Sequence, residues 1–229
     1  DRLPWPCHRL DKETTGALLC GRNPQYMRSL NSEFASRSIT RKYLAVLRGG
    51  AKSFPEKEFQ VRTLLEINDG NVSVEDGGEG TIKRCWAETN VRVLATSPIV
   101  PLTLVELQPI TGRRHQLRVH AAHIGGKPSL RLVRCLSYPL THKKEEQTKT
   151  KTERLYLHAS YVELSRYRQT GPHRHLRLGI TSPLPYNFIS LCRLAELPLP
   201  EGSIDGGVCV DGVKVGDGAV EELEGVWKG

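Results

Sequence analysis

Strand-like runs separated by turns dominate the middle of this chain and constrain its fold most strongly. Gly49–Gly50 and the polar segment 69–80 separate neighbouring runs, as turns and hairpin tips do. Runs of this kind, joined by turns, favour a mostly antiparallel sheet. The runs, rich in apolar and β-branched residues, occupy positions 17–20, 41–49, 58–67, 85–96, 101–109 and 155–164.

Helical spacing appears in two further segments. Asn is favoured at a helix N-cap and Pro at the first helical position, so Asn23 followed by Pro24 predicts a helix over 24–36. A second helix is predicted over 113–125, ending at a glycine. The two segments together with the strands predict an α+β fold. The core-facing residues would be Met27, Leu30 and Phe34 in the first helix and Leu117, Ala121 and Ile124 in the second.

The charge of the chain is uneven. Its formal net charge is +8, and residues 111–134 are rich in arginine and contain no acid, whereas acids outnumber bases over 200–229. Such a basic body favours a polyanionic partner, most simply nucleic acid. The alternative is an ordinary basic soluble protein. No stretch approaches the ~20 apolar residues of a membrane span, no secretory leader is visible, and no membrane partner is expected.

Asp11, in HRLDKETTG (8–16), is a lone aspartate beside basic residues. An aspartate before a Thr-Thr-Gly turn is most often a turn or capping residue. A catalytic carboxylate in a closed site would need a compensating cation to stay ionised. The segment TGRRHQLRVH (111–120) offers one in Arg118, at the edge of the predicted helix. The alternative for that segment is a solvated basic helix.

Other residues of these segments suit RNA. Arg113 and Arg114, near the turn before the helix, suit phosphate contacts. Tyr43 lies between Arg41 and Lys42 and could be a core residue or could stack on a base. The spacing of the histidines at 115, 120 and 123 does not place them on one helix face, so no metal site is predicted.

Five motifs in this order resemble the RluA-type family of pseudouridine synthases: HRLDKETTG, RKYLAVLRG, PITGRRHQLRVH, LYLHA and SPLPYNF. The resemblance covers roughly residues 8–190, with Thr15 where the family has serine. It implies a mixed, mostly antiparallel sheet with flanking helices and a central active-site cleft. We expect residues 1–197 to form this catalytic domain without the strand that the family places before His-Arg-Leu-Asp. Residues 143–153 would be a solvated insertion and 198–229 a Gly-rich acidic tail.

The resemblance also implies a reaction, the isomerisation of uridine in RNA to pseudouridine, without a cofactor or a metal. Asp11 matches the catalytic aspartate, Tyr43 the tyrosine that stacks on the target base, and Arg118 the arginine that pairs with the aspartate. Arg9 matches an arginine that fills the gap left in the RNA. Leu157 and His158 match a pocket strand. The residues predicted to bind RNA are His8, Arg9, Lys42, Arg113, Arg114 and His115.

One departure from the family pattern supports an alternative function. Residues 127–129 run on without the Gly-Asp pair that relatives carry after the arginine-rich helix. The alternative is a synthase-like RNA-binding factor that acts in assembly of the large ribosomal subunit, with little or no catalysis. Ribosomal RNA is expected as partner ahead of transfer RNA, together with proteins of ribosome assembly intermediates. Low-complexity insertion and altered motifs favour a mitochondrial location over a cytoplasmic or nuclear one.

Overall fold

The computed structural model describes residues 3–54, 56–68, 71–74, 83–124, 155–167 and 175–215. Its helices are α1 (Pro24–Ala35), α2 (Gln116–His123) and α3 (Tyr186–Leu194). The first strands are β1 (Trp5–Pro6), β2 (Thr15–Gly16), β3 (Cys20–Gly21), β4 (Thr40–Arg48), β5 (Glu58–Asn68) and β6 (Asn71–Val74). The later strands are β7 (Lys83–Thr96), β8 (Leu102–Pro109), β9 (Leu157–Tyr167), β10 (His175–Thr181), β11 (Gly207–Val210) and β12 (Val213–Val215).

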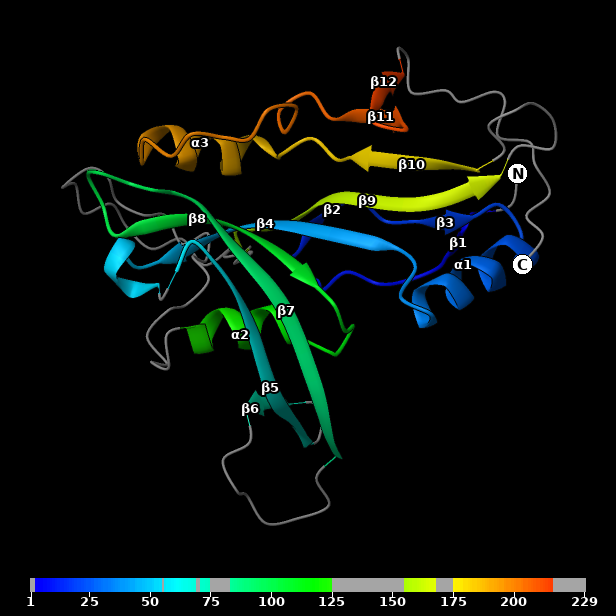
Figure 1. Ribbon diagram of the computed structural model, residues 1–229, viewed down its shortest axis with the longest axis horizontal. Coiled ribbons are helices and arrows are strands. Elements are labelled where there is room, and N and C mark those ends of the chain that lie inside the picture. The colour runs from blue at the N-terminus through cyan, green and yellow to red at the C-terminus, as the bar shows by residue number, and fades with distance from the viewer. Residues whose placement is uncertain are drawn as a thin grey trace, which may run out of the picture.

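A single large sheet organises the described residues (Figure 1). Its strand order is β12-β11-β10-β9-β4-β8-β7-β5-β6, and every pair along this path is antiparallel. The short strand β2 adds to β9 in the parallel direction, and β1 pairs with β3 in a separate ribbon. The predicted α+β class with a mostly antiparallel sheet is confirmed.

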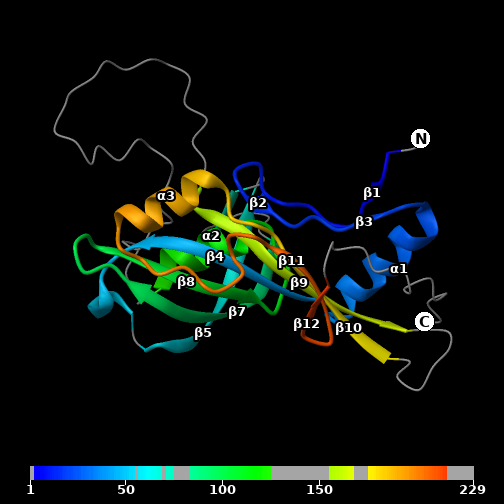
Figure 2. The same cartoon turned by 90° about the horizontal axis from the view of Figure 1, so that it is seen from above.

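The helices cover different parts of this sheet because alternate residues of each strand point to opposite faces. Tyr43, Ala45 and Leu47 of β4 pack in one core with Leu117 and Ala121 of α2. The intervening Leu44 and Val46 pack in a second core on the other face, with Phe188 and Leu191 of α3. A third core holds α1 against the far end of β9. Figure 2 shows α1 with β1 and β3 at one end of the sheet and α3 at the other.

Local sequence signals account for the best-predicted elements. The α1 helix spans 24–35 with Pro24 in its first turn, and the Asn23 side chain accepts a hydrogen bond from the Tyr26 amide, so the predicted N-cap is confirmed. The central strands lie within a few residues of their predicted bounds. Among the described residues, no helix is long and apolar enough to cross a bilayer.

Three predictions about elements were wrong. Of residues 17–20, only the last forms a strand residue, because the chain here runs between the short β2 and β3. Residues 71–74, inside a predicted loop, form β6 against β5. The predicted helix 113–125 begins only at Gln116, because His115 adopts left-handed backbone angles, φ 52°. The predicted insertion 143–153 and residues 127–129 lie outside the described residues.

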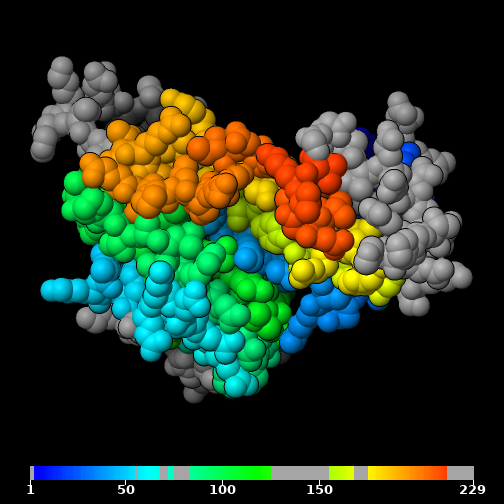
Figure 3. All heavy atoms as spheres, turned by 45° about the horizontal axis from the view of Figure 1, so that its top comes forward, coloured from blue at the N-terminus to red at the C-terminus, as the bar shows by residue number. Residues whose placement is uncertain are grey.

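The predicted tail also needs correction in its described part. Residues 207–210 pair with β10 as β11, and residues 213–215 pair with β11 as β12. Leu197 is buried in the core beneath α3. Figure 3 shows these residues, in orange and red, lying against the yellow strands of the body. Residues 207–210 and 213–215 therefore extend the edge of the large sheet, where β10 supplies the edge on which they pair.

Candidate active site

The segment HRLDKETTG forms a turn that is anchored to the centre of the sheet. The Thr14 amide donates to the Asp11 carbonyl at 2.8 Å, which closes a tight turn immediately after Asp11. Thr15 and Gly16 then pair with His158 and Ala159 of β9. This close approach requires glycine, because a Cβ at position 16 would lie 2.3 Å from the Ala159 carbonyl oxygen. The turn therefore presents the Asp11 side chain from a fixed backbone.

The Thr15 hydroxyl lies 2.8 Å from Nδ1 of His158, whose Nε2 lies 3.2 Å from the Ser182 carbonyl. A neutral imidazole satisfies both contacts, with Nε2–H donating to the carbonyl and Nδ1 accepting from the hydroxyl. Burial lowers the pKa of His158, in keeping with this neutral form. His158, predicted as a pocket residue, thus lies behind the site and anchors its turn, whereas Leu157 lines the pocket.

A second segment, TGRRHQ (111–116), is held by the buried amide of Gln116. Its Oε1 accepts from the Thr111 hydroxyl at 2.7 Å and from the Arg113 amide at 3.0 Å. Its Nε2 donates to the Glu88 carbonyl and the Thr89 hydroxyl, each at 2.9 Å. These four bonds use the full hydrogen-bonding capacity of the amide. They fix the backbone on both sides of His115, which holds that residue in its left-handed conformation.

The two segments meet where His115 contacts Asp11. Nδ1 of His115 lies 2.9 Å from Oδ2 of Asp11, and both side chains are partly buried. Among the described residues, Oδ1 of Asp11 has no hydrogen-bond partner. The carboxylate is thus held through one oxygen while the other is free to react.

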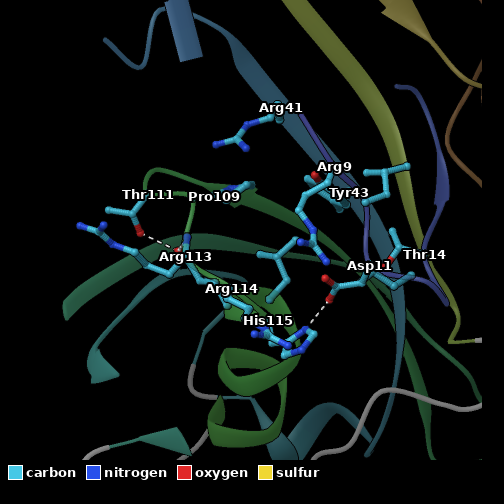
Figure 4. A pocket seen from close by; sticks show the side chains of 15 residues that line it. Arg9, Asp11, Thr14, Arg41, Tyr43, Pro109, Thr111, Arg113, Arg114 and His115 are labelled. Atoms are coloured by element: carbon cyan, nitrogen blue, oxygen red, sulfur yellow. Dashed lines mark hydrogen bonds and ion pairs between the residues drawn. The ribbon is translucent and has the colours of Figure 1, made fainter. Parts of the chain in front are cut away.

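Asp11 opens into a cavity of about 270 Å³. Leu157 and Leu117 contribute apolar walls, and Tyr43 lies buried beside them. Burial raises the pKa of Tyr43, the charge of Arg41 opposes this, and that of Asp11 adds to it. Figure 4 shows Arg9 extending its guanidinium toward Asp11, with Arg41 and Arg113 farther along the rim. The pocket therefore combines one carboxylate, one protonated phenol and a basic rim.

The position of Tyr43 depends on a bulge between β4 and β9. The register shifts between Lys42, which pairs with Tyr161, and Tyr43, which pairs with Ala159. Ser160 is the extra residue, and its hydroxyl donates to the Lys42 carbonyl at 3.1 Å. Bulges of this kind re-aim neighbouring side chains and are common beside active sites.

Arg118 does not pair with Asp11 as predicted. The described residue that pairs with it is Glu13, whose Oε2 lies 4.0 Å from its Nη2. The cause is the late start of α2. His115 lies within the span of the predicted helix but outside α2, and its ring contacts the Asp11 carboxylate. Arg118, on the first turn of α2, instead contacts Glu13 in the turn after Asp11.

Two residues predicted to bind RNA at the site lie elsewhere. Lys42 points away from Tyr43 because neighbouring strand residues alternate, and its Nζ pairs with Glu106 at 3.6 Å on the other face of the sheet. His8 accepts a hydrogen bond from the Leu19 amide at 2.9 Å and packs on the Phe34 ring, and burial lowers its pKa. The others predicted to bind RNA, Arg9, Arg113, Arg114 and His115, all line the pocket.

Sequence reasoning missed Arg41, which lines the pocket together with Tyr43. Residues two apart on a strand share a face, so its position relative to Tyr43 was the available signal. It also missed Gln116, whose role depends on groups far away in the sequence. Within the described ranges, no three His, Cys, Asp or Glu side chains gather as metal ligands do.

On the side of α2 that faces the sheet, His120 completes a buried polar chain. Its Nδ1 lies 2.9 Å from the Thr89 hydroxyl, which also accepts from Gln116, and its Nε2 lies 3.0 Å from the Thr63 hydroxyl. Burial, with a smaller effect of His123, lowers the pKa of His120 to about 4. This chain supports the residues that hold the site without reaching the pocket.

The model of the RNA pseudouridylate synthase family matches residues 2–123. The chain belongs to this family. A relative named as an RNA pseudouridine synthase of Zymomonas mobilis is 34% identical over 191 residues, 82% of this chain and 77% of that protein. The ribosomal large subunit pseudouridine synthase C of Yersinia pestis is 32% identical, over 83% of this chain and 56% of that protein.

The fold agrees with this family. The solved structure of human RNA pseudouridylate synthase domain containing 1 matches with a TM-score of 0.55 at 28% identity, covering 70% of this chain and 64% of that one. The family and fold that the five motifs implied are therefore confirmed. The chain spans only part of these relatives, between 56% of the Yersinia pestis synthase and 77% of the Zymomonas mobilis protein.

Proposed function

We propose that this protein isomerises uridine in RNA to pseudouridine, with Asp11 as the catalytic residue. The observation that carries the proposal is the carboxylate of Asp11, held through Oδ2 by His115 and open to the cavity through Oδ1. Membership of the RNA pseudouridylate synthase family supplies the reaction class.

The bonds of this isomerisation balance without a further reagent. The bond between C1′ of the ribose and N1 of uracil breaks, the freed base turns, and a bond forms between C1′ and C5. C5 loses its proton and N1 gains one. Asp11 would promote this exchange from one side of the nucleoside, and no electron acceptor is needed. A carboxylate can act in such a reaction as nucleophile or base, and the contact with His115 holds that of Asp11 in a fixed position.

The walls of the cavity suit an extruded base. Taking a base out of its stack costs about a few kcal/mol. Stacking on an aromatic ring returns about 1–3 kcal/mol, and Tyr43 offers its ring among the apolar wall residues Leu117 and Leu157. We propose that Tyr43 stacks on the target uracil and that Arg9, on the exposed rim, enters the gap in the RNA.

Ribosomal RNA is the proposed substrate, because a relative that matches over 83% of this chain is named a ribosomal large subunit pseudouridine synthase. Mitochondrial location, contacts with assembly proteins and a purely structural role in subunit assembly all stay predictions. The departure that motivated the structural role, residues 127–129, lies outside the described residues.

The experiment is tritium release from RNA transcribed with [5-³H]uridine. Forming the C5 glycosidic bond frees the label into water, so release reports the proposed reaction directly. We expect release from transcripts of large-subunit ribosomal RNA, with little from a pool of transfer RNA transcripts. Binding without release from either substrate would instead favour the RNA-binding assembly factor.

A further inference from the structure

Arg41 is a pocket arginine to which the motifs assign no role. It projects from β4 on the same side as Tyr43 and lines the cavity with Arg9, Arg113 and Asp11. Its guanidinium carbon lies 5.5 Å from the centroid of the Phe34 ring, a stacking contact that restricts the side chain. Figure 4 shows it extending over the rim of the pocket.

The guanidinium of Arg41 lacks an anionic partner. Its Nε is buried and makes no hydrogen bond. The guanidinium as a whole forms no ion pair with any described residue. Four other arginines of the described sheet have carboxylate partners: Arg62 with Glu88, Arg84 with Glu66, Arg92 with Glu106 and Arg166 with Glu33. A half-buried guanidinium usually has such a partner, because the loss of hydration must be offset. Arg41 therefore combines a buried, unbonded Nε with the lack of a carboxylate partner among the described residues.

The surroundings of Arg41 favour an external anion. Its terminal nitrogens lie beside the Gly112 turn, 3.6 and 3.7 Å from where a Cβ of residue 112 would be. The absence of a side chain at 112 leaves that side of the guanidinium approachable. His8 has its pKa lowered by burial and by the charge of Arg41 itself. The pocket's carboxylate, Asp11, is already engaged by His115.

We propose that Arg41 binds a phosphodiester group of the RNA that flanks the target uridine. Guanidinium groups bind phosphate oxygens through paired N–H donors in a planar fork, and stacking on Phe34 holds that fork in place. This inference rests on the proposed function, since it places the phosphate next to a base that enters the cavity.

The test is the salt dependence of RNA binding by the full chain. For single-stranded RNA, each neutralised phosphate contributes about 0.7 to the slope of log binding constant against log salt concentration. We expect Arg41→Met, which keeps the apolar stem over Phe34, to lower the magnitude of this slope by about 0.7 on a single-stranded large-subunit ribosomal RNA transcript. Arg92→Met is the matched control, because Arg92 pairs with Glu106 on the other face of the sheet, and its slope should equal that of the unsubstituted chain.

An unchanged slope in Arg41→Met overturns the proposal, as does an equal drop in both variants, which would indicate general surface charge. Thermal unfolding of each variant checks folding, and Arg41→Gln serves as the second neutral variant if Arg41→Met is destabilised. Tritium release is measured on the same transcripts. Failure of release by the unsubstituted chain contradicts the proposed function, whereas the slope comparison tests Arg41 from binding alone.

Discussion

Replacing His115 separates two properties that the structure combines at one residue. Its ring holds Asp11 at 2.9 Å, and its backbone lies in the left-handed region with φ 52°. Glycine at 115 tolerates that backbone and removes the donor. Asparagine also tolerates it, and its side-chain N–H lies near the position of Nδ1. His115→Gly and His115→Asn therefore form a matched pair that differs in the donor to Asp11.

The expected magnitude follows from the contact. A hydrogen bond to a charged group contributes about 1.5–3 kcal/mol, and each 1.36 kcal/mol is a tenfold change in rate. If that energy is realised in the reacting complex, His115→Gly should lower the single-turnover rate by about 10–150-fold. The left-handed conformation costs a non-glycine residue roughly 1–2 kcal/mol. Glycine removes that strain but adds chain entropy of similar size, so the free energy of unfolding should change by under about 1 kcal/mol.

The assay is tritium release under single-turnover conditions with saturating protein, alongside filter binding of the same RNA. We expect His115→Asn to retain a rate within about fivefold of the unsubstituted chain and both variants to keep its RNA affinity. Equal rates for glycine and asparagine, whether both high or both low, would refute the idea that the donor to Asp11 is what matters at this position.

Further predictions concern stability. Because the pKa of His120 is about 4 when folded and about 6.5 when unfolded, the unfolded state binds more protons between these values. The contribution of His120 to the free energy of unfolding should thus be fully present above pH 6.5 and fall by about 3 kcal/mol towards pH 4. Urea unfolding at pH 7 and 4.5 should show most of this loss, and His120→Gln should lessen it. Gly16→Ala should destabilise by more than about 2 kcal/mol, since its Cβ would meet the Ala159 backbone at 2.3 Å, and unaltered urea unfolding would count against that contact. Thr15→Val should cost about 1–3 kcal/mol by leaving Nδ1 of His158 unpaired, whereas Thr15→Ser, which keeps the hydroxyl, should be close to neutral.

Local signals in the sequence were sufficient for the elements whose causes are local. Asn23 caps α1 and Pro24 begins it, as predicted from their residue types. The apolar runs form the central strands. The start of α2 could not be predicted in this way. It depends on Gln116 reaching Glu88 and Thr89 on β7, contacts that no local pattern encodes.

The sequence predicted which segments form the site, but not which side chains contact one another within it. Asp11, Tyr43 and the basic segment do meet at one pocket. The pairing of Asp11 with His115 depends on a single backbone angle, which also explains why Arg118 reaches Glu13 instead. Lys42 was predicted to bind RNA, but Arg41 lines the pocket instead, because strand alternation decides which of two adjacent basic residues shares the face of Tyr43.

We propose that the side chain of Asp11 carries out the chemistry. The most direct measurement is nucleotide-resolution mapping of pseudouridine in large-subunit ribosomal RNA transcripts incubated with the unsubstituted chain or with Asp11→Asn. The substitution keeps the size of the side chain and removes its charge. We predict that pseudouridine appears at discrete positions with the unsubstituted chain and at none of them with Asp11→Asn, while both bind the RNA. Pseudouridine at the same positions and in the same yield with Asp11→Asn would show that the carboxylate of Asp11 is not required for the reaction.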